Sequence, residues 1–112
     1  MSNVVNYFEI GTPDAAGTTA FYGDLFGWQI GGPPDEYRMI NGDMGGLWDT
    51  ASTGGESWAI FYVQVDDVKA VIEKAEGLGG KVVVPFTDSG PLEFAHLQDP
   101  RGNRFGVWRP KG

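Results

Sequence analysis

The chain has 112 residues, of which 41% are hydrophobic and 13% aromatic, and this size and composition suit one compact domain. Its formal net charge of −7 argues against nucleic acid and anionic membranes as partners, because Lys and Arg must neutralise the phosphates of both. The lack of cysteine excludes disulfides, thiolate metal ligands and a cysteine nucleophile, and no apolar run approaches the roughly 20 residues of a membrane-spanning helix. We therefore expect a cytoplasmic protein.

The first half of the chain predicts a strand, a helix and three short strands. Residues 4–10 alternate and are rich in β-branched and aromatic side chains, which favours a strand. Asp14 is placed to cap a helix that ends at Gly27, and the Asn41-Gly42 pair is typical of a hairpin turn. The short strands are expected at residues 28–30, 37–40 and 45–49, with a turn at residues 31–34 after the first of them.

The second half repeats this order. A mostly apolar strand over residues 57–65 precedes a helix capped by Asp67, whose apolar residues recur at helical spacing. Three strands follow at residues 81–85, 92–98 and 103–109. Shifting the chain by 53 residues aligns Asp14 with Asp67. We predict a single domain of residues 1–112, built from two βαβββ modules at residues 1–50 and 57–112 that a linker at residues 51–56 joins.

Five stretches carry a resemblance to a known family: FEIGTPD, FYGDLFGW, YVQVDDV, LGGKVVVP and LQDPRGNRFGVW. In this order, around an internal repeat, they resemble the vicinal oxygen chelate superfamily, which includes glyoxalases, extradiol dioxygenases and bleomycin-resistance proteins. The resemblance implies an α+β fold in which two βαβββ modules form curved mixed sheets around a cup-shaped site. It also implies a homodimer, which agrees with the large surface that so short a chain exposes.

The resemblance also locates the three metal ligands of metal-dependent members. Tyr7, Ile60 and Gly106 stand at the places where those members carry His or Glu. An alkyl side chain and a glycine cannot bind a divalent cation, and one histidine per chain cannot supply a triad of two His and one carboxylate. We therefore expect no metal and no other cofactor.

Strand alternation predicts which side chains line the cup. If Phe8, Ile10, Phe61, Val63, Val65, Phe105 and Val107 pack under the helices, their neighbours face the ligand. The predicted ligand-binding residues are Tyr7, Ile60, Tyr62, Gln64, Phe94, Gln98, Arg104 and Trp108, together with Trp48 and Trp58 at the rim or at a dimer interface. Such a lining, aromatic with a few polar groups, is typical of small-molecule sites.

Glu9 and His96 are the candidate catalytic residues. Burial of a carboxyl raises its pKa towards the range of a general base, and an imidazole can transfer a proton near neutral pH. The structural alternatives are an ion pair between Glu9 and Arg104 and a hydrogen-bonded histidine within the sheet.

Together these features predict a metal-independent small-molecule-binding protein that sequesters an aromatic metabolite or antibiotic. The alternative is an enzyme of the same superfamily, an isomerase, epimerase, cyclase or lyase, that uses Glu9 and His96 in acid-base chemistry. A third hypothesis is an interaction role in which the dimer surface matters and the cup is vestigial.

Overall fold

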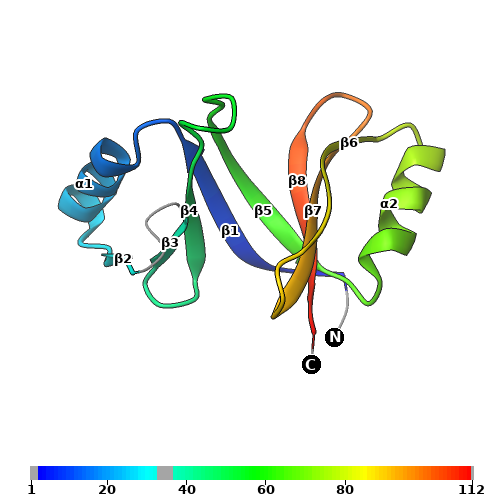
Figure 1. The fold of residues 1–112 in the computed structure, drawn as a ribbon, viewed down its shortest axis with the longest axis horizontal. Coiled ribbons are helices and arrows are strands. Elements are labelled where there is room, and N and C mark those ends of the chain that lie inside the picture. Colours follow the sequence, from blue (N-terminus) through cyan, green and yellow to red (C-terminus); the bar gives the residue numbers. More distant parts are fainter. Residues whose placement is uncertain (1–2, 33–36, 112) are drawn as a thin grey trace. The chain divides into compact units, whose positions relative to one another are not determined.

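Each half of the chain forms a strand, a helix and three strands, in that order (Figure 1). The structure is a computed structural model that describes residues 3–32 and 37–111. Its first half contains β1 (Val4–Thr12), α1 (Ala15–Phe26), β2 (Ile30–Gly31), β3 (Tyr37–Ile40) and β4 (Gly45–Asp49). Its second half contains β5 (Trp58–Gln64), α2 (Val68–Gly77), β6 (Lys81–Asp88), β7 (Leu92–Gln98) and β8 (Arg104–Pro110). The predicted α+β class and the βαβββ order are confirmed.

The chain divides into two compact units, which we call the α1 unit and the α2 unit. The α1 unit is residues 7–59, and the α2 unit is residues 60–111 together with residues 3–6. Strand order is β2-β3-β4-β1 in the first and β5-β8-β7-β6 in the second. In each unit the first strand of the module runs parallel to its last strand, β1 beside β4 and β5 beside β8, while the other neighbours are antiparallel. The internal repeat is therefore present in the topology.

The helix ends lie where the capping signals predict them. The Asp14 carboxylate accepts a hydrogen bond from the Gly17 amide at 3.0 Å, and Asp67 accepts one from Ala70 at the same distance. Gly27 ends α1 in the left-handed region at φ 72°, where glycine carries no steric penalty. The two aspartates that the sequence repeat aligns thus both act as helix N-caps, one in each unit.

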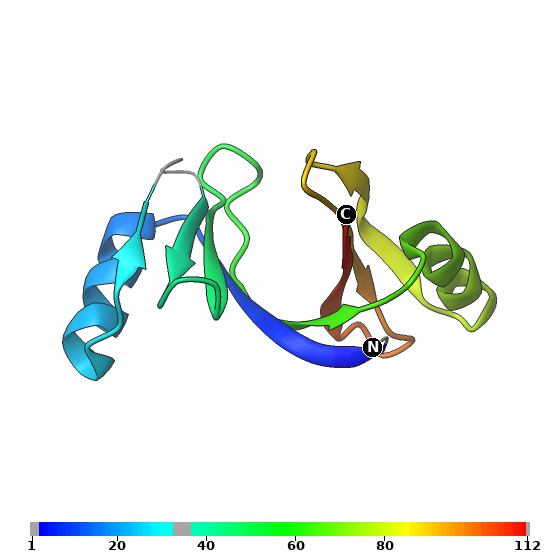
Figure 2. The same ribbon diagram turned by 90° about the horizontal axis from the view of Figure 1, so that it is seen from below.

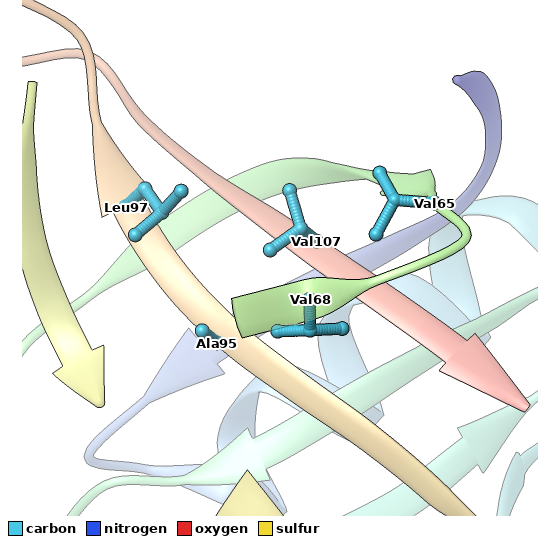
Figure 3. Packing of buried hydrophobic residues seen from close by; sticks show 5 residues of the cluster. All are labelled: Val65, Val68, Ala95, Leu97 and Val107. Carbon is cyan, nitrogen blue, oxygen red and sulfur yellow. The ribbon is translucent and has the colours of Figure 1, made fainter. Parts of the chain in front are cut away.

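Each helix covers one face of its own sheet (Figures 1 and 2). Under α2, the core consists of Val65, Val68, Ala95, Leu97 and Val107 (Figure 3). Under α1, it consists of Ile10, Ala15, Ile40 and Leu47, extended by Phe8, Tyr22, Trp28 and Ile30. Each sheet therefore has one face buried by its helix and an opposite face on which other side chains gather. No helix in the described part of the chain has the length and apolar character needed to cross a membrane.

Three sequence-based expectations need correction. The strand expected at residues 28–30 is reduced to Ile30–Gly31, and the Trp28 ring stacks on Tyr22 at 5.4 Å between ring centroids. Strand β6 continues beyond Pro85 to Asp88, because the register shift between Val84 and Thr87 in its pairing with β7 accommodates the proline. Phe61 stacks on Phe105 as expected for its face, but 47% of it stays exposed. The turn expected at residues 31–34 lies partly outside the described residues.

Candidate functional site

The face of the α1 unit that α1 does not cover carries a group of polar and aromatic side chains. Phe8 and Ile10 of β1 pack into the core under α1, so the alternating residues Tyr7 and Glu9 belong to the opposite face. On β3, Ile40 is in the core, and Tyr37 therefore shares a face with Tyr7.

A glycine in the strand between β1 and β3 lets these side chains meet. Gly46 of β4 is the register neighbour of Glu9 on one side and of Met39 on the other. A Cβ at this position would overlap the hydroxyl groups of both Tyr7 and Tyr37. The space above Gly46 is thus occupied by two tyrosine hydroxyls that reach it from neighbouring strands.

A chain of hydrogen bonds runs from Tyr7 to the Glu9 carboxylate. The Tyr7 and Tyr37 hydroxyls lie 2.8 Å apart, and Tyr37 donates to Oε1 of Glu9 at 2.9 Å. The indole Nε1 of Trp58 donates to Oε2 of Glu9 at 3.0 Å. Glu9 is only 1% exposed. Both oxygens of this buried carboxylate accept hydrogen bonds from residues on other strands, which offsets the cost of burying them.

Two tryptophans complete this group. The Trp48 ring packs edge-to-face with the rings of Tyr37 and Trp58, with distances between ring centroids of 6.4 Å and 5.5 Å. The Trp58 ring lies so close to Gly11 that a Cβ there would overlap it. We call Tyr7, Glu9, Tyr37, Trp48 and Trp58 the Glu9 cluster. Its four aromatic residues are each partly exposed, whereas the carboxylate is not.

The environment of Tyr7 opposes ionisation of its phenol. Burial, and to a smaller extent the negative charges of Glu9 and Asp43, raise the pKa of Tyr7 to about 12, against an opposing effect of the hydrogen bond to Tyr37. Tyr7 is therefore a neutral hydroxyl at physiological pH.

This pKa predicts a dependence of stability on alkaline pH. Between pH 10.0, the ordinary pKa of tyrosine, and about 12, the unfolded chain loses the Tyr7 proton while the folded protein retains it. The unfolded state then binds fewer protons, so the free energy of unfolding should fall as pH rises through this window. Urea unfolding at several pH values should show this decrease, and Tyr7→Phe should remove part of it. An equal decrease in both proteins would contradict the raised pKa.

The α2 unit contains a second buried pair, Tyr62 and His96. The Tyr62 hydroxyl lies 2.6 Å from Nε2 of His96, and the two residues are 4% and 0% exposed. Gly106 of β8 is the register neighbour of Tyr62 on β5 and of His96 on β7, and a Cβ there would be 2.5 Å from the Tyr62 ring. As in the α1 unit, a glycine in the last strand of the module lets side chains from its two neighbouring strands meet. The Phe94 and His96 rings pack edge-to-face, with 6.2 Å between their centroids.

Of the remaining predicted residues, Gln64 and Trp108 both bond to Asn6, and the others lie elsewhere in the α2 unit. The Asn6 side chain donates to Gln64 at 2.7 Å and accepts from the indole of Trp108 at 3.0 Å. Gln98 and Arg104 are register neighbours on β7 and β8, and Ile60 is 8% exposed. The structure thus groups Tyr7, Glu9, Trp48 and Trp58 in one unit, and Tyr62, Phe94 and His96 in the other.

The residues at two of the three places where the resemblance locates metal ligands cannot bind a metal ion. Ile60 and Gly106 have no side-chain donor atom, and the Gly106 position lies against the Tyr62 ring. Across residues 3–32 and 37–111, no three His, Cys, Asp or Glu side chains gather in a way that could hold a metal ion. Tyr7, at the third of these places, forms a hydrogen bond with Tyr37 at 2.8 Å.

An open pocket of about 600 Å³ lies in the α1 unit, beside α1. Ile10, Thr12, Thr18, Phe21, Tyr22 and Trp58 are among the residues that line it. Trp58 is the one residue of the Glu9 cluster in this lining. The pocket is therefore distinct from the hydrogen-bond chain, although the Trp58 side chain borders both.

From the sequence, Tyr37 is only one of several aromatic residues that could stack on a ligand, and the glycines of residues 42–46 only mark a close approach. Neither Tyr37 nor Gly46 is predicted to lie against Tyr7 or Glu9. The signal for Gly46 is the Gly45-Gly46 pair inside a strand, since a glycine there marks a close approach by another group. Tyr37 has no comparable signal, because its contact with Glu9 depends on how β3 and β4 align with β1.

Comparison with known proteins gives one family and several relatives. Residues 7–108 match the model of a family described as glyoxalase-like domain. A glyoxylase-type protein of Mycobacterium bovis, CFP32, is 30% identical over 122 residues, which is 93% of this chain and 44% of that protein. The anthracycline biosynthesis protein DnrV of Streptomyces peucetius is 25% identical over 133 residues, which is 92% of this chain and 46% of that protein. The chain thus spans less than half the length of these two relatives.

Among solved structures, a methylmalonyl-CoA epimerase of Streptomyces coelicolor is similar in fold. It has a TM-score of 0.65 and 15% sequence identity, and the match covers 100% of both chains. At this identity the likeness establishes the fold alone.

Proposed function

Because the chain belongs to the glyoxalase-like domain family, we propose that it is a metal-independent protein that binds a small aromatic molecule at the Glu9 cluster. The resemblance of its motifs to the vicinal oxygen chelate superfamily is confirmed by the family match and by the fold. The reaction, ligand and cofactor vary among proteins that share one fold, so the ligand must be argued from the residues of the site.

The single observation that supports binding is the Glu9 cluster itself. Four partly exposed aromatic rings surround a carboxylate that is fixed by two hydrogen bonds. Aromatic rings provide stacking area at a low cost in conformational entropy, and a few fixed polar groups orient a ligand. The proposal of an aromatic ligand is compatible with the name of one relative, which refers to anthracycline biosynthesis.

The geometry favours binding over direct acid-base catalysis. A general base must reach the proton that it removes, whereas Glu9 is 1% exposed and both of its oxygens already accept hydrogen bonds. His96 is completely buried and faces the Tyr62 hydroxyl.

A thermal-shift experiment tests the proposed function. Tag-free protein treated with a chelator should show a concentration-dependent rise in Tm with at least one of three aromatic probes: tryptamine, naphthol and indoleacetate, whose substituents are positive, neutral and negative. Trp58→Phe removes one hydrogen bond to Glu9 and part of an aromatic surface, and should weaken binding about tenfold.

Trp28→Phe is the matched control, because Trp28 packs under α1 and lies outside the cluster. It should leave the affinity unchanged. Stabilisation by none of the probes, or stabilisation that requires an added divalent cation, would contradict the proposal.

We also propose the homodimer that the sequence predicts. Phe21, Leu25 and Phe26 of α1 are each 57–59% exposed, and a second copy of the chain would cover such an apolar face. Sedimentation measures the mass of the particle in solution. A monomer at high concentration would contradict this part of the proposal.

A further inference from the structure

The direction of the hydrogen bonds in the Glu9 cluster is fixed by the charge of Glu9. A carboxylate only accepts hydrogen bonds, so the Tyr37 hydroxyl donates its one hydrogen to Oε1 of Glu9. The 2.8 Å contact between the two tyrosine hydroxyls must then use the hydrogen of Tyr7. Tyr7 therefore donates inward, and any further partner of its oxygen must itself donate a hydrogen bond.

The electrostatics at Tyr7 favour a positive partner. Glu9 and Asp43 both act on the Tyr7 hydroxyl as negative charges, and both raise its pKa. The basic residue of β3, Arg38, belongs to the opposite face and donates to Thr19 on α1 at 2.9 Å. The faces of Tyr and Trp rings also attract cations.

From these contacts we propose that the Glu9 cluster recognises a protonated amine carried on an aromatic or other apolar body. The inference rests on the proposed function and adds the chemical class of the ligand. The amine donates to the Tyr7 oxygen, and its apolar body packs on the rings of Trp48 and Trp58.

Changing Glu9 to glutamine should reverse the direction of the whole chain. The indole N–H of Trp58 can only donate, so it must face the carbonyl oxygen of the introduced amide. The amide nitrogen then donates to the Tyr37 oxygen, and Tyr37 donates to Tyr7. The Tyr7 hydrogen turns away from Tyr37, where the Met39 sulfur at 4.0 Å is only a weak acceptor. A site that accepts from its ligand thereby becomes a site that donates to it.

The test compares two probes of almost the same shape, phenethylammonium and hydrocinnamate, by calorimetric titration. The wild-type protein should bind the amine about tenfold more tightly, which is the scale of one charge-assisted hydrogen bond. Glu9→Gln should bind hydrocinnamate more tightly than the amine. Tyr7→Phe should bring the two affinities close together.

Glu76→Gln is the matched control, because it makes the same change of charge at an exposed position on α2. It should keep the wild-type preference. A variant that merely loses stability would weaken both probes alike, so an inverted preference cannot arise from partial unfolding.

Three results would overturn the inference. One is a wild-type preference for hydrocinnamate, which contradicts the ligand class but leaves aromatic binding in place. Another is an unchanged preference for the amine in Glu9→Gln, which would show that the amine binds elsewhere. The last is no saturable binding of either probe at millimolar concentrations. In that case, the thermal shifts with tryptamine, naphthol and indoleacetate decide whether the proposed function fails as well.

Discussion

Replacing Gly106 by alanine is expected to lower the free energy of unfolding by about 3 kcal/mol, from overpacking together with the loss of a buried hydrogen bond. The added methyl would lie 2.5 Å from the Tyr62 ring, and Tyr62 is only 4% exposed, so the ring cannot swing into solvent. Moving the ring would also break its 2.6 Å contact with His96, which has no exposed surface.

Urea unfolding of Gly106→Ala and of the wild-type protein measures this loss. Gly31→Ala is the control, because Gly31 also lies in a strand but has no atom within 4 Å of the position of an added Cβ. It should change stability by less than about 1 kcal/mol. An equal effect of the two substitutions would show that Tyr62 and His96 do not depend on the space above Gly106.

Replacing Gly46 by alanine is expected to lower the affinity for an amine strongly while lowering the free energy of unfolding only moderately. The added methyl would overlap the hydroxyls of Tyr7 and Tyr37, which are partly exposed and can move outward. The stability loss should be about 1–2 kcal/mol, while the hydrogen-bond chain to Glu9 breaks and amine binding falls at least about tenfold.

The double variant Gly46→Ala with Tyr37→Phe sharpens this test. Removing the Tyr37 hydroxyl makes room for the methyl and should recover part of the lost stability. It should not recover binding, because Tyr7 then has no link to Glu9. Calorimetric titration with phenethylammonium, together with urea unfolding, checks both effects, and full binding in either variant would contradict the role given to Gly46.

The order of elements is predictable from the sequence because local signals mark the ends of each element. Asp14 and Asp67 cap their helices through hydrogen bonds to amides three residues ahead, and Gly27 ends α1 in the left-handed region. These interactions involve neighbours in the chain, so the residue types are sufficient to predict them. The extension of β6 past Pro85 is less predictable, because it depends on irregular pairing with β7.

The faces of the strands are also predictable, but the partners across strands are not. Alternation places Tyr7 and Glu9 on the face away from the core. The contact of Glu9 with Tyr37 depends on the parallel register that sets Glu9 beside Gly46, and on the antiparallel register of β3 with β4. Loop composition does not encode these alignments, so the sequence predicts a polar face and leaves its hydrogen-bond chain undetermined.

The contact of His96 with Tyr62 also depends on the alignment of neighbouring strands. Sequence reasoning identifies it as the one imidazole of the chain and offers two roles, catalytic and structural. Its position against Tyr62 follows from Gly106 lying between them in the sheet. A glycine in a central strand is therefore informative in both units, since it shows where side chains from the flanking strands meet.

The most direct test of metal-independent binding at the Glu9 cluster is a nuclear magnetic resonance titration of chelator-treated protein with phenethylammonium. The chain has four tryptophans, and each indole N–H gives its own signal. Trp48 and Trp58 belong to the cluster, whereas Trp28 packs under α1 and Trp108 bonds to Asn6. Our account predicts saturable shifts of the Trp48 and Trp58 signals with the other two unmoved. Shifts confined to Trp28 or Trp108, or shifts that need an added divalent cation, would contradict it.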